Sequence, residues 1–198
     1  MSDLHARFGS IDIYLFDQIL KGNIRPGMSV LDVGCGKGRN LVYFLQEGYD
    51  VYGFDADPTA IQAVKALAPA LPQDHFRVES VETNTFPDAC VDVVVSIAVL
   101  HFAMDSAHFD TLLHGMWRLL KPGGLFFTRL ATTIGMEGRC EPLGHGRYHM
   151  PDGTDRYLLD EAQLLAVTKQ LGAKLVDPLK TTLVERKRAM TTWVLRKG

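Results

Sequence analysis

Three glycines stand at alternate positions directly after an apolar run, in the stretch VLDVGCGKGRN that spans residues 30–40. Glycine lacks a Cβ, so Gly34 and Gly36 would let a ligand approach the backbone closely. A helix is expected to begin just beyond, where its first N–H groups are free to meet polar ligand atoms. The stretch therefore predicts a ligand-binding turn, and a tight turn without a ligand is the alternative.

An acidic residue follows the glycines at a spacing that suits a ribose. Asp55 ends the second apolar run, about twenty residues further on, where a carboxylate can accept hydrogen bonds from two ribose hydroxyls. Capping of the helix that begins near Pro58 is the alternative role, but Asp57 directly precedes the proline and is better placed for it. The turn and Asp55 together indicate a ligand that contains a nucleoside.

The glycine spacing argues against two common nucleotide sites. A dinucleotide fingerprint reads Gly-x-Gly-x-x-Gly, whereas Arg39 occupies the third glycine position here and the glycine falls one residue earlier, at Gly38. No lysine–serine pair follows the glycines, so the stretch is not a phosphate loop for nucleoside triphosphates.

The rest of the chain alternates apolar runs with helical patterns, and these elements must position the turn. Ser10 is the expected N-cap of the first helix. Strand–helix alternation at this rhythm predicts an α/β fold, with a parallel sheet covered by helices on both faces. Strands are expected over residues 28–34, 50–57, 75–80, 91–99 and 124–131, helices over 10–20, 38–48, 58–68, 106–120 and 158–172, and a closing strand pair over 173–179 and 189–198.

Length and composition favour one small domain spanning residues 1–198. The formal net charge of −2 gives no electrostatic reason to expect nucleic acid or acidic lipid as a partner. We recognise no signal peptide and no apolar run of membrane-spanning length. The cysteines Cys35, Cys90 and Cys140 are too widely spaced for a disulfide framework or a metal site, so we expect a cytoplasmic protein without a bound metal.

Four stretches, taken in order, resemble the motifs of the class I S-adenosylmethionine-dependent methyltransferases. VLDVGCGKGRN resembles the first motif, VYGFDAD the second, FPDACVDVVVSIAVLHF the fourth-strand motif, and LLKPGGLFF the helix, turn and strand that follow. The resemblance implies S-adenosyl-L-methionine as cofactor. It also implies a Rossmann-like, doubly wound, mostly parallel seven-stranded sheet with a C-terminal antiparallel strand. The small size is similar to that of small-molecule methyltransferases, including the tellurite-resistance type.

The resemblance also assigns roles to residues at the sheet edge. Asp32 would lie near the methionine end of the cofactor, and Asp55 would hold the ribose diol. Ser80 stands where many members have an aspartate that contacts adenine, and Glu79 or Glu82 could substitute for that aspartate. The other residues implied to contact the cofactor are Gly34, Cys35 and Gly36 beneath the methionine and ribose, Ala56 beside the adenine, Val81 through its backbone N–H, and Ser96 and Ile97 at the floor.

His101 is the best candidate for a general base, because it follows the fourth strand on the cofactor side of the sheet. A histidine of the pocket wall with no proton-transfer role is the alternative. Methyl transfer needs no fixed nucleophile, and we do not expect Cys35 to act as one. His108 and His114 are expected to be ordinary helix residues.

The resemblance divides the chain into a cofactor-binding core (10–130), a middle segment (131–157) and a closing helix with a strand pair (158–198). The middle segment is longer than a connection needs and leaves the carboxyl end of the fifth strand. We therefore expect an acceptor loop or lid there, and a solvated excursion is the alternative.

The leading hypothesis is a methyltransferase that transfers a methyl group to a small-molecule acceptor by in-line displacement. One alternative is a regulatory module that binds S-adenosylmethionine without catalysis. Another is a methyltransferase acting on nucleic acid or protein, which the near-neutral charge disfavours. An oxidoreductase is weaker still because of Arg39. The acceptor and the oligomeric state are left open.

Overall fold

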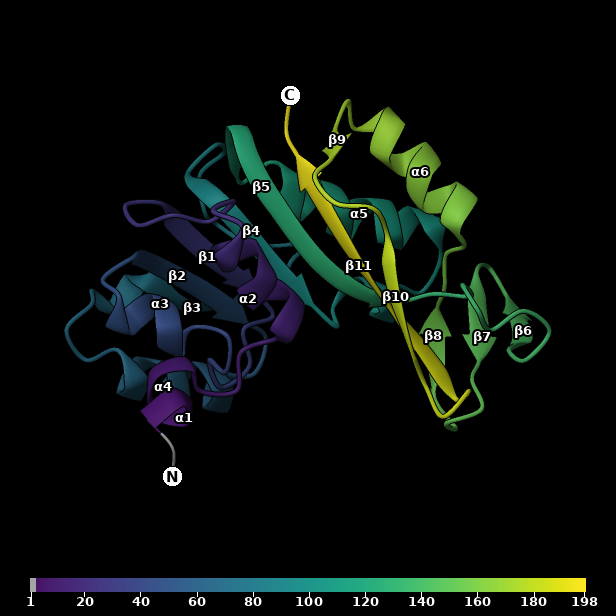
Figure 1. The fold of residues 1–198 in the computed structure, drawn as a ribbon, viewed down its shortest axis with the longest axis horizontal. Coiled ribbons are helices and arrows are strands. Elements are labelled where there is room, and N and C mark those ends of the chain that lie inside the picture. Colours follow the sequence, from purple (N-terminus) through teal and green to yellow (C-terminus); the bar gives the residue numbers. More distant parts are fainter. Residues whose placement is uncertain (1–2) are drawn as a thin grey trace.

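The computed structural model describes residues 3–198, which form a central twisted sheet with helices packed against it (Figure 1). The helices are α1 (Asp3–Phe8), α2 (Ile13–Leu20), α3 (Val42–Gln46), α4 (Pro58–Leu67), α5 (Ser106–Trp117) and α6 (Glu161–Gln170), with 3₁₀ turns η1 (Gln73–His75) and η2 (Leu100–Phe102). The strands are β1 (Ser29–Val33), β2 (Asp50–Asp55), β3 (Phe76–Val78), β4 (Val91–Ile97), β5 (Leu120–Ala131), β6 (Glu141–Gly144), β7 (Arg147–His149), β8 (Asp155–Tyr157), β9 (Lys174–Leu175), β10 (Lys180–Val184) and β11 (Arg188–Arg196).

The main sheet has the strand order β10-β11-β5-β4-β1-β2-β3, and β9 adds an eighth strand beside β11. Strands β1 to β5 pair in parallel, whereas β11 is antiparallel to β5 and β10. The expected doubly wound, mostly parallel sheet with an antiparallel C-terminal strand is confirmed, but it has eight strands where seven were expected, because β9 also pairs with β11. The strand order reverses between β1 and β4, which is where an open sheet of this kind binds its ligands.

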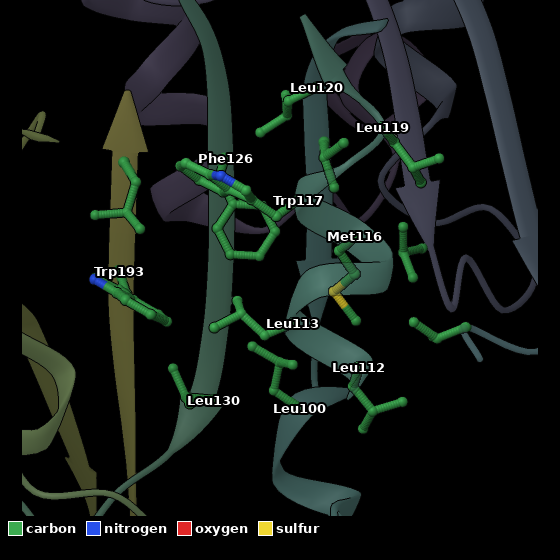
Figure 2. Packing of buried hydrophobic residues seen from close by; sticks show 14 of the residues in the cluster. Leu100, Leu112, Leu113, Met116, Trp117, Leu119, Leu120, Phe126, Leu130 and Trp193 are labelled. Carbon is green, nitrogen blue, oxygen red and sulfur yellow. The ribbon is translucent and has the colours of Figure 1, made fainter. Parts of the chain in front are cut away.

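Helices cover both faces because the strands are apolar on both sides. Along β4, Val93 and Val95 point into the core that α2, α3 and α4 cover, while Val94 points into the core beneath α5 and α6. In that second core, side chains of α5 pack against Phe126 of β5, which contacts Trp193 of β11 edge to face (Figure 2). This packing fixes the strand ends that carry the site.

Several details differ from the sequence-based expectation. The first helix begins at Ile13, because Asp12 and not Ser10 is its N-cap and accepts a hydrogen bond from the backbone N–H of Tyr14. The segment 173–179 contributes only the two residues of β9 to the sheet, and the long partner of β11 is β10.

The middle segment is more regular than a loop. Strands β6, β7 and β8 form a separate antiparallel sheet, which lies below α6 and beside the β10–β11 hairpin (Figure 1). The turn between β6 and β7 uses Gly144 and Gly146, and the connection between β7 and β8 contains Gly153, all at positive φ. Strand β8 also contacts η2, so this small sheet lies against the edge where β4 ends.

Candidate functional site

Two adjoining pockets open at the carboxyl ends of the parallel strands. We call the first, of about 380 Å³, the glycine-turn pocket, and the second, of about 480 Å³, the hairpin pocket. Ala98 and Phe102 line both. The remaining residues of the glycine-turn pocket are Gly34, Phe54, Asp55, Ala56, Glu79, Ser80, Val81, Glu82, Val99, His108 and Leu112. Those of the hairpin pocket are Arg39, Ile97, His101, Arg129, Ala131, Met150, Asp152, Thr154, Arg156, Thr182, Val184, Arg188 and Met190.

The junction of the pockets has a strained backbone. Ala98 directly follows β4 with φ of 63°, a left-handed conformation that non-glycine residues seldom adopt. The backbone N–H of Ala98 donates to the carbonyl of Arg129 at 2.9 Å, which holds the strained turn against β5. Such strain is concentrated at functional sites, because the surrounding structure must maintain it.

The first two glycines of the turn have different neighbours. A Cβ on Gly34 (φ 68°) would lie 2.6 Å from Cγ2 of Val99, so glycine is required there by the packing of the protein itself. A Cβ on Gly36 (φ 52°) would meet no atom within 4 Å. Space is therefore open beside Gly36, whereas Gly34 is the glycine that lines the glycine-turn pocket.

Packing also explains the other residues of the turn. A Cβ on Gly38 would lie 3.2 Å from Val64, so this glycine lets α4 approach the turn. The thiol of Cys35 lies against Gly53 of β2 and is buried in the core. Burial, with the nearby charge of Asp32, raises the pKa of this thiol far above its usual range. Cys35 is thus an inert packing residue on the side facing the core.

Asp55 is half-buried at the end of β2 and lines the glycine-turn pocket. Its Oδ2 accepts the backbone N–H of Gly36 and its Oδ1 that of Asp57, each at 2.9 Å. A carboxylate has about four acceptor positions, so Asp55 can still accept hydrogen bonds from a ligand. Helix α4 is capped by Asp57, whose Oδ1 accepts the N–H of Thr59 at 2.8 Å, as the sequence predicts.

Asp32 and Ser96 are buried polar residues on the neighbouring strands β1 and β4. Within the described chain, Oδ2 of Asp32 and Oγ of Ser96 have no hydrogen-bond partner. Burial raises the pKa of Asp32 to about 7, although Arg39 and Asn40 favour the charged form. Buried polar atoms are nearly always paired, so an unpaired carboxylate oxygen beside the turn fits a site for a cation or a hydrogen-bond donor.

The far wall of the glycine-turn pocket is polar and internally bonded. The hydroxyl of Ser80 lies 3.1 Å from that of Thr83, and Glu79 accepts the backbone N–H of Thr85 at 3.0 Å. Glu82 accepts a hydrogen bond of 2.9 Å from Nε2 of His108, whose Nδ1 accepts the N–H of Met104. His108 is a residue of helix α5, as expected, and it also lines the glycine-turn pocket. The sequence pattern does not reveal this position, because it depends on the contact with Glu82, which lies 26 residues earlier in the chain.

His101 lies in η2 and lines the hairpin pocket while being almost fully buried. Its Nδ1 accepts the backbone N–H of Ala131 at 3.0 Å, so the neutral ring carries its proton on Nε2. Burial and, secondly, the charge of Arg156 lower the pKa of His101 to about 4. In this arrangement the ring can donate a hydrogen bond but has no free nitrogen to take a proton.

The hairpin pocket holds arginines that sequence reasoning mostly missed. Arg129 of β5 forms an ion pair with Asp12, lies over the ring of Tyr14 at 4.7 Å, and has an unpaired, buried Nε within residues 3–198. Arg156 of β8 lies over the ring of Phe102 at 4.7 Å. A single charged residue in the apolar strand LFFTRLA was the one local signal for Arg129.

Residues 3–198 provide neither a metal-binding cluster nor a membrane-spanning helix. No three His, Cys, Asp or Glu side chains in this part of the chain are grouped so as to hold a metal ion. None of its helices is long and apolar enough to cross a membrane.

Comparisons with known proteins identify the class. Residues 31–128, about half the chain, match the protein-family model described as a methyltransferase domain. This match supports a methyltransferase domain of the class I S-adenosylmethionine-dependent type over these residues. This domain confirms S-adenosyl-L-methionine as the cofactor that the motifs implied.

Two curated relatives each match more than half of this chain. An uncharacterized methyltransferase of Synechocystis is 37% identical over 103 residues, 52% of this chain and 47% of its own length. A tRNA N(3)-cytidine methyltransferase of Xenopus tropicalis is 32% identical over 158 residues, 70% of this chain and 46% of its own. This chain thus spans about half the length of these curated relatives.

A solved structure shares the fold over most of both chains. The 1,6-didemethyltoxoflavin-N1-methyltransferase of Burkholderia thailandensis, with 1,6-didemethyltoxoflavin and S-adenosylhomocysteine bound, superposes with a TM-score of 0.69 at 20% identity. The match covers 98% of this chain and 81% of that one. The similarity to the tellurite-resistance type stays a prediction.

Proposed function

We propose that this chain is a methyltransferase that transfers a methyl group from S-adenosylmethionine to a small-molecule acceptor. The cofactor would occupy the glycine-turn pocket and the acceptor the hairpin pocket. The observation that carries this proposal is that the two pockets adjoin at Ala98 and Phe102, at the reversal of strand order. Ligands in the two pockets would therefore meet at one point, as transfer requires.

The residues of the glycine-turn pocket suit the cofactor. Asp55 has acceptor positions left for the ribose hydroxyls, and Gly36 leaves open space beside it. The unpaired oxygen of Asp32 suits the amino group at the methionine end. Ser80 and Val81 line the pocket where the adenine would lie, together with Ala56. The residues predicted to contact the cofactor also include Cys35, Ser96 and Ile97. Of these, Ile97 lines the hairpin pocket and Cys35 faces the core.

The bound cofactor supplies an activated methyl group, so the protein mainly has to orient the acceptor and exclude water. We assign His101 the role of a hydrogen-bond donor to the acceptor through Nε2–H, because its Nδ1 already accepts the N–H of Ala131. We also propose that the segment 131–157 forms part of the acceptor site and acts as a lid. Met150, Asp152 and Thr154 of this segment line the hairpin pocket.

A small acceptor is supported by the size of the hairpin pocket, about 480 Å³, which is within the range of small-molecule sites. The net charge of −2 does not favour a nucleic acid. A macromolecular acceptor is the second candidate, because one relative is named as a tRNA methyltransferase. Three free cysteines support a cytoplasmic setting.

Transfer of a labelled methyl group tests the proposal. The protein would be incubated with S-adenosylmethionine carrying a deuterated methyl and with cell extract separated into dialysable molecules, RNA and protein. We expect the label in a dialysable product, and no label with the Gly36→Val variant. Label in RNA or protein alone would favour the second candidate. Bound cofactor without any transfer in all fractions would favour the regulatory module.

A further inference from the structure

The hairpin pocket gathers positive charge from four separate parts of the chain. Its walls include Arg39 of the glycine turn, Arg129 of β5, Arg156 of β8 and Arg188 of β11. Asp152 is the one carboxylate among the lining residues, and it is exposed. This excess contrasts with the formal net charge of −2 for the chain. Like charges around one cavity repel one another, so the arrangement is favourable when an anion lies between them.

Most of this charge is not neutralised by the protein. Arg129 is paired with Asp12 but keeps a buried Nε without a partner in the described residues. Across residues 3–198, Arg39, Arg156 and Arg188 form no ion pair. Among the described residues, Arg39 donates only to the backbone carbonyl of Ser10, and Arg156 only to that of Asp155. Their guanidinium groups therefore retain donors for a ligand.

The other groups on the walls agree with this interpretation. His101 presents a neutral donor, since its Nδ1 is occupied by the N–H of Ala131. Thr154 and Thr182 add hydroxyls, and Met150 and Met190 add apolar surface. Donors thus outnumber acceptors around a partly apolar cavity, which is the complement of an apolar molecule with a negatively charged oxygen group.

We infer that the methyl acceptor carries a carboxylate or a phosphate monoester, bound by Arg156 and Arg188 with help from Arg129, on an apolar body that contacts Met150 and Met190. This inference rests on the proposed function, because it identifies the hairpin pocket with the acceptor site. Arginine forms paired hydrogen bonds with both kinds of anion, so the shared chemistry is a planar or tetrahedral oxyanion.

Paired probes separate charge from shape. Benzoate is compared with benzamide, and phenyl phosphate with phenol, in protein saturated with S-adenosylhomocysteine and in protein without it. Methionine methyl groups labelled with ¹³C report binding by NMR, because Met150 and Met190 line the hairpin pocket. Met116 of α5 is buried in the core and serves as the internal reference. We expect one charged probe to shift the signals of Met150 and Met190 and to leave that of Met116 unchanged. Its neutral counterpart should bind at least 10-fold more weakly.

Arginine variants assign the effect to the pocket. Arg156→Gln and Arg188→Gln should each weaken the charged probe roughly 10-fold, which is the loss of one charge-assisted interaction. Arg186→Gln is the matched control, because Arg186 is exposed on the same hairpin but does not line the pocket. It should leave the probe affinity unchanged. Unchanged affinity for S-adenosylhomocysteine in all three variants shows that they are folded.

Two results would overturn the inference. One is equal binding of the charged and neutral probes. The other is that neither charged probe shifts Met150 or Met190. A failure of the proposed function can be told apart from a failure of this inference. If the proposed function is wrong, the protein will not bind S-adenosylhomocysteine, but the probe titrations in its absence will still show whether the arginines bind an anion.

Discussion

Substitution of the first two glycines of the turn should separate protein packing from ligand access. Gly34→Ala places a Cβ 2.6 Å from Cγ2 of Val99, whereas ordinary contacts begin at 3.4 Å. A left-handed alanine costs about 1–2 kcal/mol and a forced contact in a packed region about 1–3 kcal/mol, so we expect a loss of roughly 2–5 kcal/mol in unfolding free energy. Gly36→Ala carries only the backbone cost of about 1–2 kcal/mol, because its Cβ meets open space.

Urea unfolding and calorimetry with S-adenosylhomocysteine read out the two effects. Gly34→Ala should be the less stable variant, and adding Val99→Ala should recover part of its loss in a double-mutant cycle. Gly36→Ala should stay folded but bind the ligand more weakly, since its methyl enters the space beside Asp55. Equal stability losses for the two single variants would refute the packing role of Gly34. Wild-type ligand affinity in Gly36→Ala would refute ligand access at Gly36.

Three further predictions concern the site. Asp55→Ala should weaken S-adenosylhomocysteine binding about 10- to 150-fold, or about 1.5–3 kcal/mol, in calorimetry on the folded variant, and unchanged affinity would remove Asp55 from the ribose site. Burial holds the pKa of Asp32 near 7 in the folded protein, above its value in the unfolded chain. The stability that protonation of Asp32 contributes is therefore present below about pH 4 and is lost as the pH rises through 7. Urea unfolding from pH 5 to pH 8 should therefore show a smaller decline for Asp32→Asn than for wild type, and parallel curves would contradict this. Replacing residues 137–152 by a short glycine–serine linker should abolish methyl transfer and keep cofactor affinity within a few-fold, and full activity would eliminate the lid.

The parallel sheet could be predicted because its signals are local. Apolar runs mark the strands, and Asp57 before Pro58 marks the start of α4, which the structure confirms. The start of the first helix was predicted wrongly, because Ser10 was expected to cap it and Asp12 does so. Asp12 is held there by contacts with distant residues: it pairs with Arg129 and donates its backbone N–H to Oδ1 of Asn40.

The hairpin pocket could not be predicted, because it is built from distant segments. Arg129, Arg156 and Arg188 come together only through the pairing of β11 with β5 and the contact of β8 with η2. The role of Gly34 was likewise hidden, since Val99 lies more than sixty residues further along the chain. Local patterns determine elements, whereas the identity of neighbours across strand ends depends on the whole topology.

The most direct test of the central claim is a calorimetric comparison of two nucleoside ligands. S-adenosylhomocysteine and NAD would be titrated separately into the wild-type protein, with Asp55→Ala as the control for the site. We expect saturable one-to-one binding of S-adenosylhomocysteine, weakened in Asp55→Ala, and no binding of NAD. Saturable binding of NAD, or no heat from S-adenosylhomocysteine with a natively folded protein, would contradict this expectation.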